Sequence, residues 1–508
     1  MKHPMIRSRR VRYGSMTVYL TVALITAIVL FNAIFSALAK YYTWYIDMTP
    51  DQLYSITDAC RDQLQDAIDK AEEETGKPVK ATIYFCEDYN KYEEGSVGYY
   101  IYNTAKQLKE LYPDNVEVDW FDCWVEKKRA EELGVKASTN VVLVIEDGGK
   151  RVFTQKEFFV FEGTNTTAPV GYDGERVFAT TFASLIGKDR PLALFTTNHE
   201  ELFFDDTLML ALRDAGYNID WIDLYYKDIP EECELLITYN PNNDFIVSDG
   251  ISETDEIDKL DDYMARGGNM MVFLSASSPE LPSFETFLSE WGVSVGRTYD
   301  KETGHPFNAM VKDTSVSLTA DGFTIYGEYV TAGKGAQITS DLQSSNYVPH
   351  VVFSDATVLL AADGFGSQDG MTYQKGSRTR SDIFVGSDRA EPWACGAKLE
   401  GYDSLPLMTV TEDSSTGGQV VVCSSIQFAG EKYLQSAVFG NFDALLSLCR
   451  TMGLEDVIYG LRYKPFSSNT ISTVTTSQML SWTLWLSITP AVLIAAVATF
   501  VLVRRKHS

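Results

Sequence analysis

Positive charge is scarce in this chain of 508 residues, which has 43 Lys and Arg against 70 Asp and Glu and a formal net charge of −27 at pH 7. A strongly acidic surface repels nucleic acid and anionic lipid headgroups, because both carry negative charge. We therefore expect no nucleic acid among the partners of this protein.

Cysteine is also sparse, and the seven cysteines form no C-x-x-C pair. They are odd in number and far apart, which fits neither a disulfide framework nor a zinc site. We expect most of them to be small buried hydrophobic residues, and we predict no metal. The seven positions are Cys60, Cys86, Cys123, Cys233, Cys395, Cys423 and Cys449.

Two motifs of nucleotide and ester chemistry are missing. A P-loop needs a glycine five positions before its Gly-Lys pair. The chain has two Gly-Lys pairs, at 187–188 and 333–334, and the required glycine is replaced by Phe182 before the first and by Glu328 before the second. The chain also has no G-x-S-x-G nucleophile turn. The sequence therefore predicts a protein that is not an enzyme and uses no cofactor, so that any ATP hydrolysis belongs to a partner.

Two long apolar runs are present, one near each end. The first is uncharged from Gly14 to Ala39, and the second ends an uncharged stretch from Pro465 to Val503. About 20 apolar residues in a helix cross the hydrocarbon layer of a bilayer. We therefore predict transmembrane helices at residues 16–39 and 479–503.

The charges that flank these runs predict their orientation. Five basic residues lie in the tail 1–15 and three in the tail 504–508, with no acid in either, so the region between them carries −35. Cytoplasmic flanks collect Lys and Arg. We expect both tails to be cytoplasmic, with the acidic region outside the plasma membrane of a bacterium. An alternative stays open, because Ala37-Leu38-Ala39 has the form of a signal-peptide cleavage site.

Residues 40–190 alternate between strand and helix patterns. After a helix that Thr57 caps and Gly76 ends, the expected order is β-α-β-α-β-β-α. This order predicts a thioredoxin-like α/β domain without the redox chemistry, because Cys86 is not followed by the second cysteine of a C-x-x-C pair. The expected elements are strands at 79–86, 116–123, 140–146 and 151–155, and helices at 99–112, 126–133 and 175–186.

Residues 191–460 begin a second alternating unit. Short apolar strands between helices predict a doubly wound, flavodoxin-like or glutamine-amidotransferase-like α/β domain. Residues 297–400 are rich in Gly, Ser, Thr and Asp and are expected to form a β-rich insertion, and residues 461–478 a tether. The expected elements are strands at 192–196, 218–224, 234–239, 269–275 and 418–424, and helices at 206–215, 253–266 and 435–452.

The order of several segments resembles the GldG-like auxiliary proteins of ABC-type transport systems, the "ABC-type uncharacterized transport system" family. The resemblance covers residues 15–290 and the final helix pair, and its segments in order are an anchor, LYSIT, IYFC, VEVDWFD, LALFTTNHEE, LRDAGY, NIDWIDL, IPEECELLITYNP and DKLDDYMARGGNMMVFLS. The resemblance implies an ABC ATPase and an ABC permease as partners, and it implies no particular substrate.

The candidate site follows the first strand of the second unit. Asn198, His199, Glu200, Glu201 and Asp205 lie where open α/β sheets place their ligands. The resembled family shows Thr-Gly-His-Gly-Glu here, so that both glycines are replaced in this chain. One histidine among acids is compatible with a contact to a ligand or partner, with a divalent cation, or with a polar loop before a helix.

The sequence thus predicts a non-enzymatic, membrane-anchored, extracytoplasmic subunit of an ABC-type transport system. Its helices would dock on the permease, and its external domains would bind cargo or an envelope component that the sequence does not identify. Two alternatives stay open. One is an envelope hydrolase or metal-dependent glycan enzyme with its site near His199, and the other is a free-standing envelope scaffold.

Overall fold

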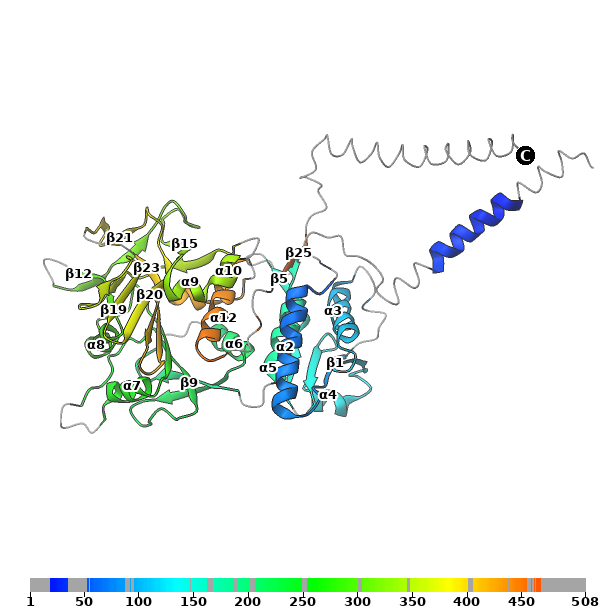
Figure 1. Cartoon of the computed structure of the whole chain (residues 1–508), viewed down its shortest axis with the longest axis horizontal. Helices are drawn as coiled ribbons and strands as arrows, with labels where there is room; N and C mark the ends of the chain where they lie inside the picture. The colour runs from blue at the N-terminus through cyan, green and yellow to red at the C-terminus, as the bar shows by residue number, and fades with distance from the viewer. Residues whose placement is uncertain are drawn as a thin grey trace, which may run out of the picture. The chain divides into compact units, whose positions relative to one another are not determined.

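The computed structural model describes most of the chain between the two apolar runs. The described residues are 19–34, 55–86, 96–146, 148–161, 168–186, 190–201, 206–248, 254–299, 304–344, 348–400, 405–436, 438–454 and 463–466, with the single positions 53, 92, 458 and 461. The described residues up to Lys464 form one compact unit. The fold is mixed α/β with several separate sheets (Figure 1).

The first sheet has four strands in the order β2-β1-β3-β4. β1 is parallel to β2 and antiparallel to β3, and β3 is antiparallel to β4. Helices α2 and α5 lie side by side (Figure 1). The elements are α2 (Asp58–Thr75), β1 (Ala81–Phe85), α3 (Val97–Leu111), β2 (Val116–Trp120), α4 (Lys127–Leu133), β3 (Val141–Ile145), β4 (Lys150–Phe153), η2 (Gln155–Phe158), β5 (Phe159–Phe161), β6 (Pro169–Tyr172) and α5 (Gly174–Ile186).

Local chemistry explains the ends of α2. The hydroxyl of Thr57 accepts a hydrogen bond from the backbone N–H of Cys60, which satisfies one of the unpaired donors of the first turn. The helix ends at Gly76, whose φ of 65° lies in the left-handed region that favours glycine. Both residues do what the sequence predicts.

The cysteines also fit the expectation that most are buried. Five of the seven are buried, Cys123 is half-buried and Cys395 is exposed, and none of the seven forms a disulfide. Cys86, at the end of β1, packs with Phe121 and Ala130.

The large sheet runs β16-β15-β20-β23-β24-β10-β9-β7-β8 and contains eleven strands with β18 and β19. β8, β7, β9, β10 and β24 are parallel, and β23 turns antiparallel to β24. The elements that build its parallel part are β7 (Leu192–Thr197), α6 (Thr207–Ala215), β8 (Asn218–Asp223), β9 (Cys233–Tyr239), α7 (Glu256–Ala265), β10 (Asn269–Phe273), α8 (Pro282–Glu290), β23 (Pro406–Asp413), β24 (Gln419–Cys423), η3 (Ile426–Ala429), α11 (Glu431–Leu434) and α12 (Asn441–Thr451).

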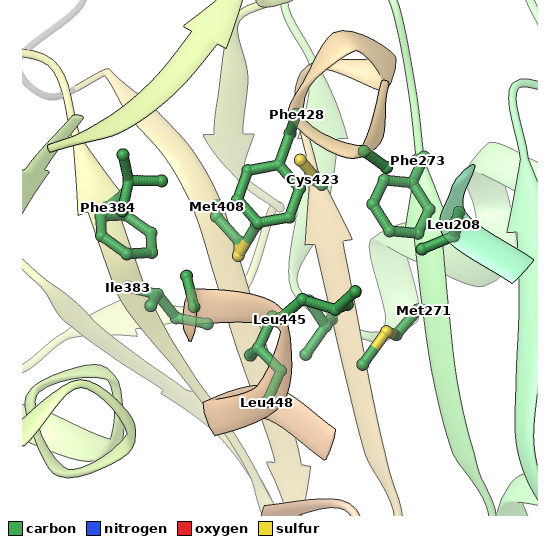
Figure 2. Close-up of a cluster of buried hydrophobic side chains, with 14 of the residues drawn as sticks. Leu208, Met271, Phe273, Ile383, Phe384, Met408, Cys423, Phe428, Leu445 and Leu448 are labelled. Carbon is green, nitrogen blue, oxygen red and sulfur yellow. The ribbon is translucent and has the colours of Figure 1, made fainter. Parts of the chain in front are cut away.

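Helices cover both faces of this sheet because alternate residues of each strand point to opposite sides. Met271 and Phe273 of β10 pack with α6 and α12 in the cluster that Figure 2 shows, together with Leu208 and Leu445. The intervening residues of β10 join a second buried cluster with side chains of α7 and α8. The core of residues 191–460 is therefore a sheet between two helical layers.

Residues 297–400 are rich in strands, as predicted, but they are not set apart from the large sheet. β15, β16 and β20 extend its antiparallel half, β18 and β19 join it beside β20, and the other short strands pair in small separate sheets. The elements of this region and the strand before it are β11 (Val293–Val295), β12 (Arg297–Tyr299), β13 (Pro306–Asn308), β14 (Met310–Lys312), β15 (Thr324–Tyr329), α9 (Gly333–Ile338), α10 (Ser340–Ser344), β16 (Val351–Ser354), β17 (Leu359–Ala361), β18 (Gly366–Ser367), β19 (Thr372–Lys375), β20 (Arg378–Val385), β21 (Glu391–Ala394) and β22 (Ala397–Lys398).

Near Lys464 the chain packs again on residues 55–186. β25 (Lys464–Pro465) pairs with β6, which in turn pairs with β5. The ammonium of Lys464 donates to the carbonyl oxygen of Ser55 at 2.5 Å and forms an ion pair with Glu175 in the first turn of α5. Glu175 also accepts hydrogen bonds from the backbone N–H and the hydroxyl of Thr57. We call these contacts of Ser55, Thr57, Glu175 and Lys464 the clasp.

The membrane spans predicted from the sequence are only partly within the described residues. Residues 19–34 of the first are helical, with exposed apolar side chains such as Leu24 and Phe31. In the part of the chain that the structure describes, no helix has both the length and the apolar character that a membrane crossing requires. The second span, both basic tails and most of the tether lie outside the described residues, so both spans stay predictions.

Candidate functional site

The candidate residues lie at the carboxyl ends of the parallel strands, where the chain order of the sheet reverses. The connection from β7 leads to β8 on one side, and the next strand, β9, lies on the other side of β7. Ligands of open α/β sheets bind outside such a switch point. The loop after Thr197 and the loop after Tyr239 meet there.

His199 is held between two carboxylates. Its Nδ1 lies 3.1 Å from an oxygen of Glu201, and its Nε2 lies 3.1 Å from an oxygen of Glu256, the first residue of α7. All three side chains are at most 4% exposed. The structure thus brings two of the candidate residues together with a third residue that lies 57 positions further along the chain.

The two carboxylates keep this imidazole protonated. Burial alone would lower the pKa of His199, but the hydrogen bonds and negative charges of Glu201 and Glu256 outweigh burial and raise its pKa to about 9. At neutral pH the ring is therefore a buried cation with both nitrogens donating. It has no lone pair with which to act as a base or to bind a metal ion.

The backbone around His199 turns sharply. Asn198 has φ 82° and Glu200 has φ 53°, both in the left-handed region, and both residues are exposed. Between them, the N–H of His199 donates to Glu201 at 2.9 Å. The turn therefore directs His199 and Glu201 inward and leaves Asn198 and Glu200 at the surface. These are the two positions at which the resembled family has glycine.

His199 also connects this turn to the loop after β9. Its carbonyl oxygen accepts hydrogen bonds from the N–H groups of Asn242 and Asn243, at 2.8 and 2.9 Å. Its ring stacks on Phe245, with the ring centroids 3.8 Å apart. The same oxygen of Glu256 that binds the ring accepts the N–H of Ile246 at 2.8 Å. Removing the His199 side chain would therefore loosen two loops at once.

A second polar group at this edge was missed from the sequence. The side-chain oxygen of Asn240 accepts hydrogen bonds from Ser275 and Ser278, at 2.8 and 2.9 Å. Asn240 follows β9, has φ 50° and is fully buried, and its amide nitrogen has no hydrogen-bond partner among the described residues. Because the carboxyl ends of parallel strands share one edge, the Asn-Pro that ends β9 was a usable signal. Glu256 gave no such signal.

The remaining candidates contribute less. Asp205 lies outside the described residues, so its prediction is untested. Asp206 precedes α6 and makes no side-chain capping bond with it. Among the residues that the structure describes, no three His, Cys, Asp or Glu side chains are placed to hold a metal ion. The geometry therefore provides a rigid, buried ionic group below an exposed acidic turn.

Comparison with known proteins adds little to this picture, since no family model matches the chain. A "Neuferricin homolog" of Caenorhabditis elegans is 22% identical over 207 residues, or 38% of this chain. The match spans only 60% of that relative's own length.

Three solved structures are similar over about half of the chain. The N-terminal domain of IFT52 is 14% identical, covers 51% of this chain and 96% of its own, and has a TM-score of 0.35. A ThuA-like protein from Bacteroides uniformis is 10% identical, with 52% and 93% coverage and a TM-score of 0.28. A cytoplasmic protein from Salmonella typhimurium is 12% identical, with 54% and 99% coverage and a TM-score of 0.29. Scores this low support no argument about function.

Proposed function

We propose that this chain is a non-enzymatic, membrane-anchored, extracytoplasmic subunit of an ABC-type transport system. Its partners are an ABC ATPase and an ABC permease, and its two apolar ends dock on the permease within the plasma membrane of a bacterium. The external region binds cargo or an envelope component. The ordered resemblance to GldG-like proteins and the basic flanks of the apolar runs support this proposal.

The finer fold assignment belongs to the same proposal. A sheet in the order β2-β1-β3-β4, with a parallel first pair and an antiparallel second pair, fits a thioredoxin-like domain at residues 40–190. Five parallel strands between two helical layers fit a doubly wound domain at residues 191–460. Both assignments leave the external region without an evident reaction of its own.

The clasp is the observation that supports this proposal most directly. Ser55 follows the predicted first anchor by 16 residues and Lys464 precedes the predicted second anchor by 15, yet the two residues are hydrogen-bonded. The two segments that lead toward the anchors therefore leave the external region at one place. This arrangement suits a protein whose two predicted anchors reach the same permease.

The alternative of an enzyme near His199 has less support. A nucleophile or base must be reachable by substrate and carry a free lone pair. His199 is 2% exposed and donates from both nitrogens at neutral pH. An envelope hydrolase or glycan enzyme would therefore need another site.

The test is purification of the tagged full-length chain from its own membranes in mild detergent, followed by mass spectrometry. An ATPase and a permease of the ABC type should co-purify in stoichiometric amounts. A matched variant, in which both apolar runs are replaced by unrelated apolar spans of equal length, should reach the membrane but lose both partners.

Two results would contradict the proposal. If neither partner is recovered from the unaltered chain, the free-standing scaffold becomes the better interpretation. If the purified chain turns over an envelope substrate, the enzyme interpretation replaces ours.

A further inference from the structure

A hollow of about 890 Å³ lies away from the switch point, within the compact unit of residues 1–464. It is lined by residues of β4, α5, α6 and β8 and by the segment before β7. Its volume falls in the range of about 300–1,000 Å³ that small-molecule sites occupy. The polar side chains that line it include Lys150, Arg151, Thr181, Ser184, Arg190 and Arg213.

The charge of this hollow opposes that of the whole chain. Four cationic residues line it against one acid, Glu157, in a protein with a net charge of −27. Like charges that share one hollow repel each other, and the repulsion is relieved when a bound anion supplies the opposite charge. The excess of cations over acids in the lining therefore favours an anionic ligand.

Two of the cations are already held in place. The guanidinium of Arg151 is 3.3 Å from a carboxylate oxygen of Glu157 and lies over the ring of Phe153, 5.5 Å from its centroid. The ammonium of Lys150 donates to the carbonyl oxygen of Glu132. Side chains that are fixed before binding lose less conformational entropy when a ligand arrives.

Arg213 differs, because it is exposed at the last turn of α6. Its planar guanidinium offers paired N–H donors that match two oxygens of a phosphate or carboxylate. Ser184 adds a hydroxyl to the lining, and this hydroxyl donates to the carbonyl oxygen of Thr181 at 2.9 Å. The lone pairs of this hydroxyl and the carboxylate of Glu157 do not attract an anion, so the attraction comes from the cations. Several cations in one lining favour a ligand that carries more than one negative charge.

We propose that this hollow binds a small phosphate ester, either free in solution or as the headgroup of a lipid. A phosphomonoester carries about −1.5 to −2 charges near pH 7 and presents three acceptor oxygens, which suits several converging cations better than a single carboxylate does. This site is separate from the His199 turn and does not rest on the proposed transport function.

The test uses the full-length chain in a neutral detergent and isothermal titration calorimetry with inorganic pyrophosphate and glycerol phosphate. A third arm measures co-flotation with vesicles that contain phosphatidic acid, the phosphomonoester lipid, against vesicles of phosphatidylcholine alone. Saturable binding of a soluble probe identifies a free phosphate ester, and selective binding to anionic vesicles alone identifies a headgroup. Either result supports the site if it weakens as the salt concentration rises.

Two variants locate the binding. Arg213→Gln and Lys150→Gln each remove one cation from the lining and should each weaken binding about tenfold, the effect of losing one charged hydrogen bond. Arg389→Gln, which removes an exposed arginine outside the hollow, is the matched control and should leave the affinity unchanged. Thermal unfolding of each variant checks that the fold is retained.

The proposal is overturned if no probe binds saturably below about 1 mM and no vesicle selectivity is seen. It is equally overturned if binding occurs but is unaffected by both lining variants, or if Arg389→Gln weakens it as much as they do.

Discussion

The clasp leads to a sharp prediction about stability, which Lys464→Met tests. Lys464 and Glu175 are buried, with side chains 6% and 4% exposed. Methionine keeps most of the apolar stem of lysine but removes the charge, so that the buried carboxylate of Glu175 loses its cation and keeps neutral partners such as Thr57. Removing one partner of a buried ion pair costs about 3–5 kcal/mol, because the other charge stays buried without compensation.

The measurement is urea unfolding of the full-length chain in detergent, followed by far-ultraviolet circular dichroism. With a slope of about 2–3 kcal/mol per molar urea, the midpoint for the region that contains the clasp should fall by roughly 1–2 M. The double variant Glu175→Gln with Lys464→Met should recover most of the loss, since it removes both buried charges.

The matched control is Lys398→Met. Lys398 also forms an ion pair, with Glu391 at 2.9 Å, but the two side chains are 47% and 40% exposed. Exposed pairs contribute little, because water and salt screen both charges. We expect no measurable change in the midpoint. If Lys464→Met and Lys398→Met behave alike, or if the double variant is no more stable than Lys464→Met, the clasp does not stabilise the fold as argued.

Three further predictions concern residues 191–460. The pKa of His199 is raised to about 9, so the stability that its positive charge contributes should be complete below pH 6.5 and lost as the pH rises through 9. Thermal unfolding measured against pH should show this loss of stability, and His199→Gln should remove it. Glu200→Gly should be neutral or stabilise by up to about 1 kcal/mol, whereas Glu200→Val should destabilise, because φ is 53° there. Arg380 and Asp382 form a fully buried ion pair at 2.7 Å. In urea unfolding, Arg380→Met alone should lower the free energy of unfolding by about 3–5 kcal/mol, because Asp382 stays buried without its partner. Arg380→Met combined with Asp382→Leu should be neutral or stabilising, because both buried charges are removed.

Much of the secondary structure was predictable because its signals are local. The hydroxyl of Thr57 and the left-handed Gly76 bound α2 as expected. The strands of the parallel sheet agree with prediction to within two residues at each end, since each is a short apolar run between polar turns. The predicted helix 435–452 was wrong at its start, because α11 ends at Leu434 and a separate helix, α12, begins at Asn441.

Pairing between distant segments was not predictable in the same way. Nothing near Arg378 indicates that β20 lies beside β23, or that residues 297–400 contribute strands to the large sheet. Such pairing depends on which faces are buried after the chain has folded, and a single sequence does not record it. For the same reason, the partnership of His199 with Glu256 and of Lys464 with Glu175 appeared only in three dimensions.

The geometry of the turn after β7 changes which residue best tests partner binding. The His199 ring contacts Glu201 and Glu256 and stacks on Phe245 in the loop after β9, so His199→Ala would disturb the fold whether or not a partner binds there. Glu200 is exposed, and its substitution leaves the buried ionic group intact. If this turn contacts a partner, Glu200→Gln should weaken co-purification while thermal stability stays unchanged. A loss that appears only with His199→Ala would reflect collapse of the turn, and the exposed surface would then have no part in binding.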